Sequence, residues 1–527
     1  MTPSPAQQAV LDQCVANERD FPKTYKRRHI FVSAKAGSGK STLLTMIIAH
    51  CARYSLSCGV TMFNKVVATG MKEKVKSLGI NMQSLRVDTA HSFGYAAFRN
   101  FRRGKRFQVE VGKCKLIYRD LFRNHREAYK VERQVMHLVS QAKQRGLGIE
   151  AIDPRAKEHG IGPTNPMWEQ IINHFRVELE GVDLNFEWII DAASQTLALS
   201  NKQHEIIDFD DQLYLPLLLN ALFDTYDYLL VDEAQDSNAV RREIFRRSLA
   251  PGGCLIVVGD PHQAIYGFAG ADNDSLHIFQ REFDMLEFPL NICFRCDRAI
   301  IKMAQQWVPE IEARPDAAEG LIHRGEYSSF IARLDRLRLG GDDAILCRKN
   351  APLMRLCFIL MRKQIGCRFE GRDIGIQFVN FLKQLEQGTL RSVQQNLIEF
   401  QRYENMKLRA KGDDAAADLM NDKCAAMESL VTYATTQGWN VHKLESFIQG
   451  MFADSENPET PKDVVVLSSV HKAKGKEWDR VFLLGRAQFM PSPFTKTDWE
   501  AQQEKNLIYV AVTRAKHQLL EVTNIPE

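Results

Sequence analysis

The stretch that most constrains the fold is residues 29–48, HIFVSAKAGSGKSTLLTMII. Ile30 to Ser33 form an apolar run typical of a buried strand, a glycine-rich turn follows, and an apolar helix starts near Lys40. The turn, AKAGSGKS at 34–41, has the P-loop pattern with Ala34 at the position of the first glycine. The strand before it and the helix after it favour a phosphate-binding loop over a simple glycine-rich turn.

Each residue of this loop has its own expected task. Lys40 would bring positive charge to the terminal phosphates, and the Ser41 hydroxyl is suited to ligate Mg²⁺. Glycines let backbone N–H groups converge on phosphate oxygens, and the positive end of the following helix faces the same anion. The residues expected to hold the nucleotide here are Ala36, Gly37, Ser38, Gly39, Lys40, Ser41 and Thr42.

A second apolar run, in LLVDEAQDSN at 229–238, ends directly in acidic residues. By itself this pattern fits a solvated loop with helix-capping acids. Buried charge is costly unless it is paired or holds a metal, so the alternative is a magnesium site. Together with a P-loop, the second interpretation is favoured. Asp232 would then hold Mg²⁺, and Glu233 would orient and deprotonate the attacking water.

Length and composition limit the class of protein. A chain of 527 residues is too long for one core and predicts two to four domains. We see no apolar run of about 18 residues and no secretory signal at the N-terminus, so neither membrane insertion nor secretion is expected. The 11 cysteines show no framework spacing, and Cys293 and Cys296 form one C-x-x-C without a second pair. A reducing cytoplasm suits such a chain better than a zinc site or disulfides.

Positive charge is concentrated between Arg99 and Arg145, where 14 Lys or Arg stand against four Asp or Glu. Phe101 and Phe107 lie within this basic stretch. Basic residues mixed with aromatic ones suit a polyanion such as a nucleic acid. A solvated helical face is the alternative.

Further motifs follow in order along nearly the whole chain. They are PSPAQQAV (3–10), MFNKVVATGMKEKV (62–75), DTAHSFGYAAF (88–98), IDFDDQLYL (207–215), VDEAQDSN (231–238), VVGDPHQAIYGFAGA (257–271), CFRCDRAI (293–300), AILCRKNAPLM (344–354), VVVLSSVHKAKGKEWDRVFLLG (464–485) and EKNLIYVAVTRAKHQLL (504–520). This series resembles the motifs of UvrD/Rep/PcrA-like superfamily 1 DNA helicases, in which DExQD is characteristic of motif II.

The resemblance implies further roles at the nucleotide. Gln7 would read the adenine, Phe294 would stack on the base, and Glu477 would contact the ribose. Gln263 would sense the γ-phosphate. Arg295 and Arg514 would be arginine fingers, because a planar guanidinium can bridge charge on the transferred phosphoryl group.

The resemblance also implies a track for single-stranded DNA, on which aromatic side chains stack against bases of any sequence. The residues expected to line it are Phe63, Asn64, His91, Ser92, Tyr266, Phe268, Arg348 and His471, with Phe93 as a further candidate. For each aromatic residue, packing in the core is the alternative.

Three positions depart from the family. Thr42 replaces an Arg that stacks on adenine, Ala269 replaces the Arg of motif III, and Phe294 replaces a Tyr. Adenine would be held less selectively, and coupling between the ATP and DNA sites could differ.

The expected fold class is α/β, with two RecA-like parallel-sheet P-loop domains, each interrupted by a mainly helical insertion. The expected boundaries are 1–95 with 200–285 for the first domain (1A), 96–199 for a basic insertion (1B-like), 286–375 with 461–527 for the second domain (2A), and 376–460 for a reduced insertion (2B-like).

The leading function is an ATP- and Mg²⁺-dependent single-stranded DNA translocase that unwinds tailed duplex DNA, with 3′-to-5′ movement implied by the resemblance. The alternative is a DNA-dependent ATPase that remodels complexes or needs a partner, with weak unwinding alone. An RNA-directed helicase is a third class. We expect a cytoplasmic monomer of bacterial or viral origin.

Overall fold

The computed structural model describes residues 2–80, 84–175, 177, 184–267, 270, 274–363, 365–370, 372–386, 388–410, 414–451, 463–492, 495 and 497–526. The chain divides into two compact units, one comprising Met1–Lys35 and Gly39–Leu290, the other Ala36–Ser38 and Asn291–Glu527. Each unit contains a parallel sheet with helices, so the predicted α/β class is confirmed. The finer division into four domains stays a prediction.

The first unit is organised around a six-stranded sheet in which every neighbouring pair is parallel, in the order β3-β2-β6-β7-β1-β8. Its strands are β1 (Ile30–Ala34), β2 (Cys58–Met62), β3 (Leu85–Thr89), β6 (Tyr226–Val231), β7 (Leu249–Gly259) and β8 (Leu286–Leu290). The central strands are nearly continuous apolar runs, as expected where both faces of a sheet are covered.

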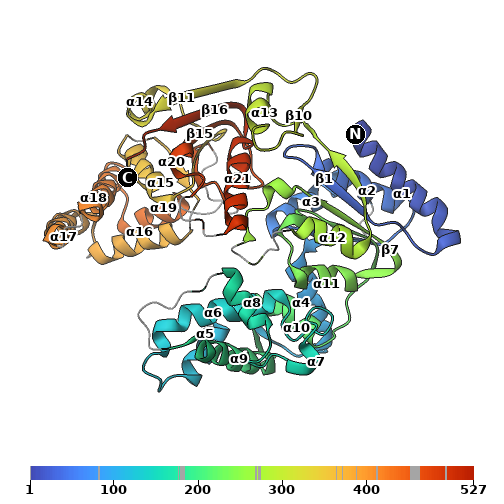
Figure 1. Ribbon diagram of the computed structural model, residues 1–527. Coiled ribbons are helices and arrows are strands. Elements are labelled where there is room, and N and C mark those ends of the chain that lie inside the picture. The colour runs from blue at the N-terminus through green and yellow to red at the C-terminus, as the bar shows by residue number, and fades with distance from the viewer. Residues whose placement is uncertain are drawn as a thin grey trace. The chain divides into compact units, whose positions relative to one another are not determined.

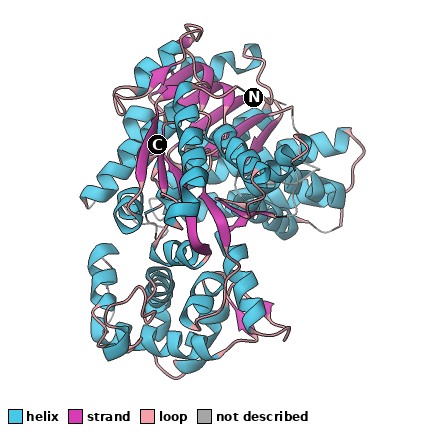
Figure 2. Ribbon diagram, turned by 90° about the vertical axis from the view of Figure 1, so that its right-hand side faces the viewer, coloured by secondary structure: helices cyan, strands magenta, loops and turns pink. Residues whose placement is uncertain are grey.

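Strand β6 shows how both faces are buried. Tyr228 and Leu230 belong to one hydrophobic cluster, whereas Leu229 and Val231 belong to another. Successive side chains of a strand point to opposite faces, so each cluster lies on its own side of the sheet. Figures 1 and 2 show helices on both sides of the strands. These helices are α1 (Pro5–Thr24), α2 (Lys40–Arg53), α3 (Lys65–Ser77), α4 (Ala90–Phe101), α10 (Asp211–Leu218), α11 (Ala239–Arg247) and α12 (Ser275–Phe283).

A helical insertion separates α4 from α10 in the sequence. Its elements are β4 (Gln108–Val109), α5 (Lys113–Leu121), α6 (Ala128–Arg145), α7 (Ala156–His159), α8 (Met167–Phe175), α9 (Phe186–Lys202) and β5 (Ile206–Ile207). Strands β4 and β5, from near its start and its end in the sequence, pair in parallel. Its buried residues belong to the same hydrophobic cluster as one face of the sheet, and Figure 1 shows its helices gathered beside α4 and α10.

Two lysines of the basic stretch lie inside this insertion rather than on its surface. Lys113 and Lys143 are 2% and 1% exposed. Lys113 Nζ lies 2.7 Å from Asp211 Oδ2, and Lys143 Nζ contacts both Asp208 Oδ2 (2.5 Å) and Asp211 Oδ1 (2.7 Å). Burial alone would lower the pKa of Lys143, but the two carboxylates outweigh it and raise this pKa. These pairs therefore fix α5 and α6 to the start of α10.

The second unit contains another six-stranded parallel sheet, in the order β11-β16-β15-β12-β14-β13. Its strands are β11 (Leu321–Glu326), β12 (Asp343–Cys347), β13 (Cys367–Phe369), β14 (Val465–Ser469), β15 (Trp478–Leu484) and β16 (Ala515–Thr523), with β9 (Ile292–Cys293) paired to β10 (Glu312–Ala313) outside the sheet. The helices beside this sheet are α13 (Arg298–Ala304), α14 (Tyr327–Arg333), α15 (Asn350–Arg362), α20 (Arg486–Phe489) and α21 (Asp498–Val512).

The second insertion consists of helices, as its sequence predicts. They are α16 (Arg372–Leu385), α17 (Leu390–Ala410), α18 (Asp414–Thr436) and α19 (Val441–Met451). Met427 and Leu444 of these helices share one hydrophobic cluster with Ile345 and Leu467 of the sheet. This helical segment is therefore continuous with the core of its own unit.

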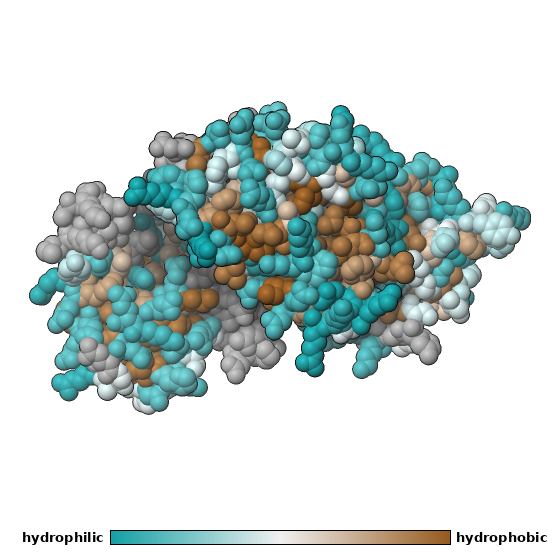
Figure 3. Space-filling model, turned by 90° about the horizontal axis from the view of Figure 1, so that it is seen from below, coloured by the Kyte–Doolittle hydropathy of each residue, from teal (hydrophilic) through white to brown (hydrophobic). Residues whose placement is uncertain are grey.

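No described helix combines the length and the apolar character needed to cross a membrane. On the face shown in Figure 3, hydrophilic residues surround several separate hydrophobic patches.

Candidate active site

The P-loop and the acidic motifs follow strands that are neighbours in the first sheet. The P-loop follows β1, Asp232 follows β6, and Asp260 follows β7, and the sheet order is β6-β7-β1. The carboxyl ends of parallel strands meet at one edge of the sheet, where α/β proteins bind their ligands. The topology therefore brings together residues that lie far apart in the sequence.

The P-loop turn has the backbone that its glycines permit. Gly37 and Gly39 have φ angles of 68° and 85°, in the left-handed region. Helix α2 begins at Lys40, with Gly39 at the N-cap and no side-chain cap. Gln7 Nε2 donates to the carbonyl of Gly39 at 3.2 Å, so the predicted adenine reader lies beside this turn.

Lys40 and Glu233 form an ion pair. The distance from Lys40 Nζ to Glu233 Oε1 is 2.8 Å, and both side chains are largely buried, at 14% and 17% exposure. Burial alone would lower the pKa of Lys40, but the carboxylates of Glu233, Asp232 and Asp260 outweigh it, and this pKa is raised. Lys40 thus stays charged, and it holds the predicted general base.

Two residues without a predicted role connect Glu233 to the predicted γ-phosphate sensor. Gln235 Nε2 donates to Glu233 Oε2, and Gln235 Oε1 accepts from the Asp260 backbone N–H at 3.1 Å. Asp260 Oδ2 in turn accepts from Gln263 Nε2 at 2.7 Å. At Gly259 a Cβ would lie 2.6 Å from Gln235 Oε1, so only glycine leaves room for this amide. Lys40, Glu233, Gln235, Asp260 and Gln263 therefore form one continuous hydrogen-bonded chain.

The donor set fits a magnesium nucleotide. The charges of Glu233, Asp232 and Asp260 all act on the ammonium of Lys40. The described residues contain no group of three His, Cys, Asp or Glu side chains that could hold a metal ion by themselves, but Mg²⁺ is usually held by one or two carboxylates together with phosphate oxygens. The hydroxyl of Ser38 is buried and has no hydrogen-bond partner among the described residues, although it lies in the turn where phosphate oxygens are expected. A bound phosphate would satisfy it.

The structure brings together two of the residues predicted to stack on DNA. The rings of Phe63 and Tyr266 are stacked, with centroids 5.5 Å apart and planes 16° from parallel. Phe63 is 42% exposed, which argues against a purely structural core role. Tyr266 follows Gln263 by three residues, so the aromatic pair lies next to the hydrogen-bonded chain in sequence. Phe268 lies outside the described residues.

The other predicted DNA residues of the first unit differ in their surroundings. The ring of His91 lies against the exposed ring of Phe209, with centroids 4.1 Å apart and planes tilted by 34°, and burial together with the charge of Arg241 lowers the pKa of His91 to about 3. His91 is therefore neutral near pH 7. Asn64 is the N-cap of α3, where its side chain accepts from Val67 N at 2.9 Å. Phe93 is 3% exposed and belongs to the core, in agreement with the alternative interpretation.

Ser92 lies in the first turn of α4. Its backbone N–H donates to Thr89 Oγ1, the N-cap side chain of that helix, at 3.3 Å. Its carbonyl accepts from Arg86 Nη2 at 2.9 Å. Both partners of Ser92 thus lie close to it in the sequence.

The two predicted arginine fingers are held inside the second unit. Arg295 forms an ion pair with Glu477 and donates from Nη1 to the Thr513 carbonyl at 3.3 Å. Arg514 is 1% exposed and donates to the carbonyls of Val510 (3.0 Å) and Lys476 (2.9 Å). Glu477, expected at the ribose, therefore has Arg295 as its partner in this structure. Phe294, beside Arg295, is 42% exposed.

Arg348 and His471, the predicted DNA contacts of the second unit, lie close to one another. Arg348 binds the carboxylate of Glu504 through Nε (3.1 Å) and Nη2 (2.9 Å). Burial and the charge of Arg348 lower the pKa of His471 to about 4, so His471 is also neutral near pH 7.

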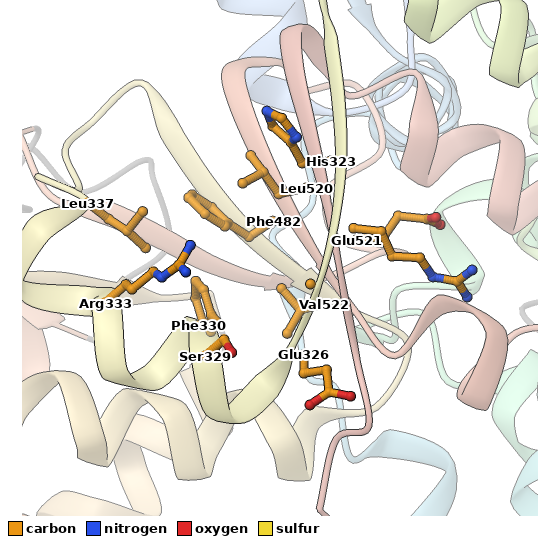
Figure 4. A pocket seen from close by; sticks show the side chains of 12 residues that line it. His323, Glu326, Ser329, Phe330, Arg333, Leu337, Phe482, Leu520, Glu521 and Val522 are labelled. Carbon is orange, nitrogen blue, oxygen red and sulfur yellow. The ribbon is translucent and has the colours of Figure 1, made fainter.

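A surface cavity of about 270 Å³ also lies in the second unit, between β11, α14, β15 and β16. Figure 4 shows Phe330, Phe482, Leu520 and Val522 along it, with Arg333 near its edge. None of its lining residues is among those predicted to bind nucleotide or DNA.

Comparison with known proteins agrees with this arrangement. Residues 16–284 match the UvrD/REP helicase N-terminal domain, and residues 383–524 match the UvrD-like helicase C-terminal domain. The chain is 22% identical to DNA helicase II of Escherichia coli strain K12, over 94% of this chain and 82% of that protein. It is 24% identical to a probable DNA helicase II homolog of Mycoplasma capricolum subsp. capricolum, over 93% of this chain and 81% of that protein.

The first of these domain matches covers more than half of the chain, and it includes the P-loop and the acidic motifs whose geometry is described above. The chain therefore belongs to the UvrD/REP helicase family of ATP-dependent DNA helicases.

Proposed function

We propose that the protein is a single-stranded DNA translocase that moves 3′ to 5′ and separates the strands of tailed duplex DNA. The observation that supports this most is the hydrogen-bonded chain from Lys40 to Gln263, which stops three residues before Tyr266. One short segment thus joins a candidate γ-phosphate sensor to a candidate base-stacking ring. The names of the relatives, DNA helicase II and its homologs, agree with a DNA substrate.

In this proposal Glu233 takes a proton from the attacking water, while Gln235 holds its carboxylate in one orientation. Lys40 and the P-loop backbone bind the β- and γ-phosphates. Mg²⁺, held by Ser41 and Asp232, would supply positive charge to the phosphate oxygens. Arg295 and Arg514 would stabilise charge on the transferred phosphoryl group.

The DNA track would use stacking rather than base-specific contacts. Phe63 and Tyr266 offer π-faces to any base, and His91 would act as a neutral ring because its pKa is lowered to about 3. The exposed arginines and lysines of the basic stretch would contact phosphates, so affinity should fall as salt rises.

The experiment is ATP turnover with and without single-stranded DNA, followed by unwinding of duplexes with either a 3′ or a 5′ tail. The proposal predicts that DNA raises turnover and that the 3′-tailed duplex is unwound in preference. The same assays with RNA of identical sequence separate a DNA motor from an RNA-directed one.

A second candidate is a DNA-dependent ATPase that unwinds little without a partner. The feature that favours it is the reduced size of the second insertion, residues 376–460. DNA-stimulated turnover without unwinding of either tailed duplex would support this candidate over the first.

A further inference from the structure

Arg241, on α11, connects to the carboxyl end of motif II. Its Nη1 donates to the backbone carbonyl of Asp236 at 2.6 Å. Asp236 is the last residue of the 3₁₀ turn Ala234–Asp236, which also contains Gln235. Burial lowers the pKa of Arg241, while the carboxylates of Asp236 and Asp210 act against this shift. The guanidinium is thus hydrogen-bonded to the acidic motif, and the charge of Asp210 also acts on it.

Asp210 is held by helix α6 of the first insertion. Its Oδ2 accepts from Ser140 Oγ at 2.6 Å, and its Oδ1 accepts from Gln144 Nε2 at 3.3 Å. Ser140 and Gln144 are four residues apart, so both lie on one face of α6. The last turns of α6 therefore fix the carboxylate that attracts Arg241.

The same face of α6 lies against the segment that follows Gln263. Gly270 has a φ angle of 90°, and a Cβ at this position would lie 2.0 Å from Gln144 Oε1 and 3.0 Å from Gln141 Oε1. Gln141 is 3% exposed, and its Oε1 accepts no hydrogen bond from a described residue. One helix thus contacts Gly270 directly and also holds Asp210, whose charge acts on Arg241, the donor to the Asp236 carbonyl.

We propose that Arg241 is a positioning residue for ATP turnover, and that with Asp210 and Gln144 it couples the nucleotide-site motifs to helix α6 of the insertion. Helix α6 has 18 residues and carries part of the basic stretch, including the exposed Lys130 and Arg133. Phosphate contacts along this rigid helix would change the position of Ser140 and Gln144. Arg241 would transmit that change to the turn that holds Gln235, and coupling of this kind acts in both directions.

The DNA half of this inference rests on the proposed function, so the test has two readouts. The first is hydrogen exchange of the α6 backbone amides with and without a non-hydrolysable ATP analogue, in the absence of DNA. The second is the ratio of ATP turnover with single-stranded DNA to turnover without it. The variants are Arg241→Gln and Gln144→Ala. The matched control is Arg246→Gln on the same helix as Arg241, because the side chain of Arg246 is 43% exposed and pairs with Glu243 and Glu282 instead of with the acidic motif.

In the wild type and in Arg246→Gln, the analogue should slow exchange at residues 140–145, and this effect should be lost in Arg241→Gln. The stimulation ratio should fall about five- to tenfold in both Arg241→Gln and Gln144→Ala, with the melting temperature measured on the same preparations.

Unchanged α6 exchange in the wild type, or a full stimulation ratio in both variants, would overturn the inference. If the wild type shows no stimulation by DNA, the proposed function fails, while the exchange measurement still decides the coupling. If Arg241→Gln does not fold, hydrogen exchange in the wild type and the stimulation ratio of Gln144→Ala decide the inference.

Discussion

Lys40 Nζ lies 2.8 Å from Glu233 Oε1, although the two residues are 193 positions apart in the sequence. The lysine expected at the phosphates is thus paired with the carboxylate expected to activate water. Phosphate oxygens would compete for Lys40, and Glu233 would then be released to act as a base. Gln235 and Asp260 keep this carboxylate connected to Gln263.

Replacing Lys40 and replacing Glu233 should affect different steps of the ATPase cycle. Lys40→Ala should abolish ATP binding or turnover, because it removes the charge that is expected to face the phosphates. Glu233→Gln should keep ATP binding and lower hydrolysis at least about a hundredfold, the usual scale for a general base. Equilibrium nucleotide binding and steady-state turnover, measured on both variants, check this prediction. Wild-type turnover in Glu233→Gln would show that another residue is the base.

Gln235→Ala should lower kcat with little change in KM for ATP. The variant removes a hydrogen bond to a carboxylate, which is worth about 1.5–3 kcal/mol and corresponds to roughly ten- to a hundredfold in rate. Gln195→Ala is the matched control, since Gln195 donates to Asp191 on the solvent side of α9. Equal kcat values in both variants would show that Gln235 does not contribute to ATP turnover.

Phe63→Ala and Tyr266→Ala should each weaken binding of single-stranded DNA. Stacking contributes about 1–3 kcal/mol per base and tolerates any sequence, so homopolymeric and mixed strands should be affected alike. Tyr403→Ala provides the control, because Tyr403 is an aromatic residue with 60% exposure that has no predicted DNA role. A lower melting temperature combined with unchanged DNA affinity would instead assign the two rings to packing.

Lys143→Met should destabilise the protein by about 3–5 kcal/mol, because it leaves the carboxylates of Asp208 and Asp211 in the interior without one of their cations. The control is Lys130→Met on the same helix. Lys130 pairs with Glu127 at the surface, so the loss there should be about 0–1 kcal/mol. Urea unfolding of the full chain measures the loss of stability in both variants. Equal unfolding midpoints for the two variants would contradict the structural role of the buried cluster.

The grouping of the P-loop with the acidic motifs could be predicted from the sequence because the signals of these motifs are local. Each motif consists of an apolar strand followed at once by glycines or acids, so Lys40, Asp232 and Glu233 are recognisable without their partners. Gln235 and Asp260 were missed, although Asp260 follows β7 directly and Gln235 lies in the short turn after β6. Their connection depends on β6 and β7 being neighbours in the sheet, which no local pattern states.

The basic stretch shows the opposite limit. A count of charges treats Lys113 and Lys143 like the exposed arginines around them, but both are buried against Asp211 and Asp208, which lie 98 and 65 positions further along the chain. Arg241 was missed for a similar reason, since the two carboxylates that act on it, Asp236 and Asp210, come from separate segments of the chain. Pairing at such a distance follows from the tertiary fold and leaves no periodic signal.

The most direct test of the proposed function is strand separation with a 3′-tailed and a 5′-tailed duplex of the same sequence, in the presence of ATP and Mg²⁺. Lys40→Ala and omission of ATP serve as controls. We predict that the wild type unwinds the 3′-tailed duplex preferentially, and that both controls abolish unwinding. Equal unwinding by Lys40→Ala, or a preference for the 5′-tailed duplex, would contradict an ATP-driven motor that moves 3′ to 5′.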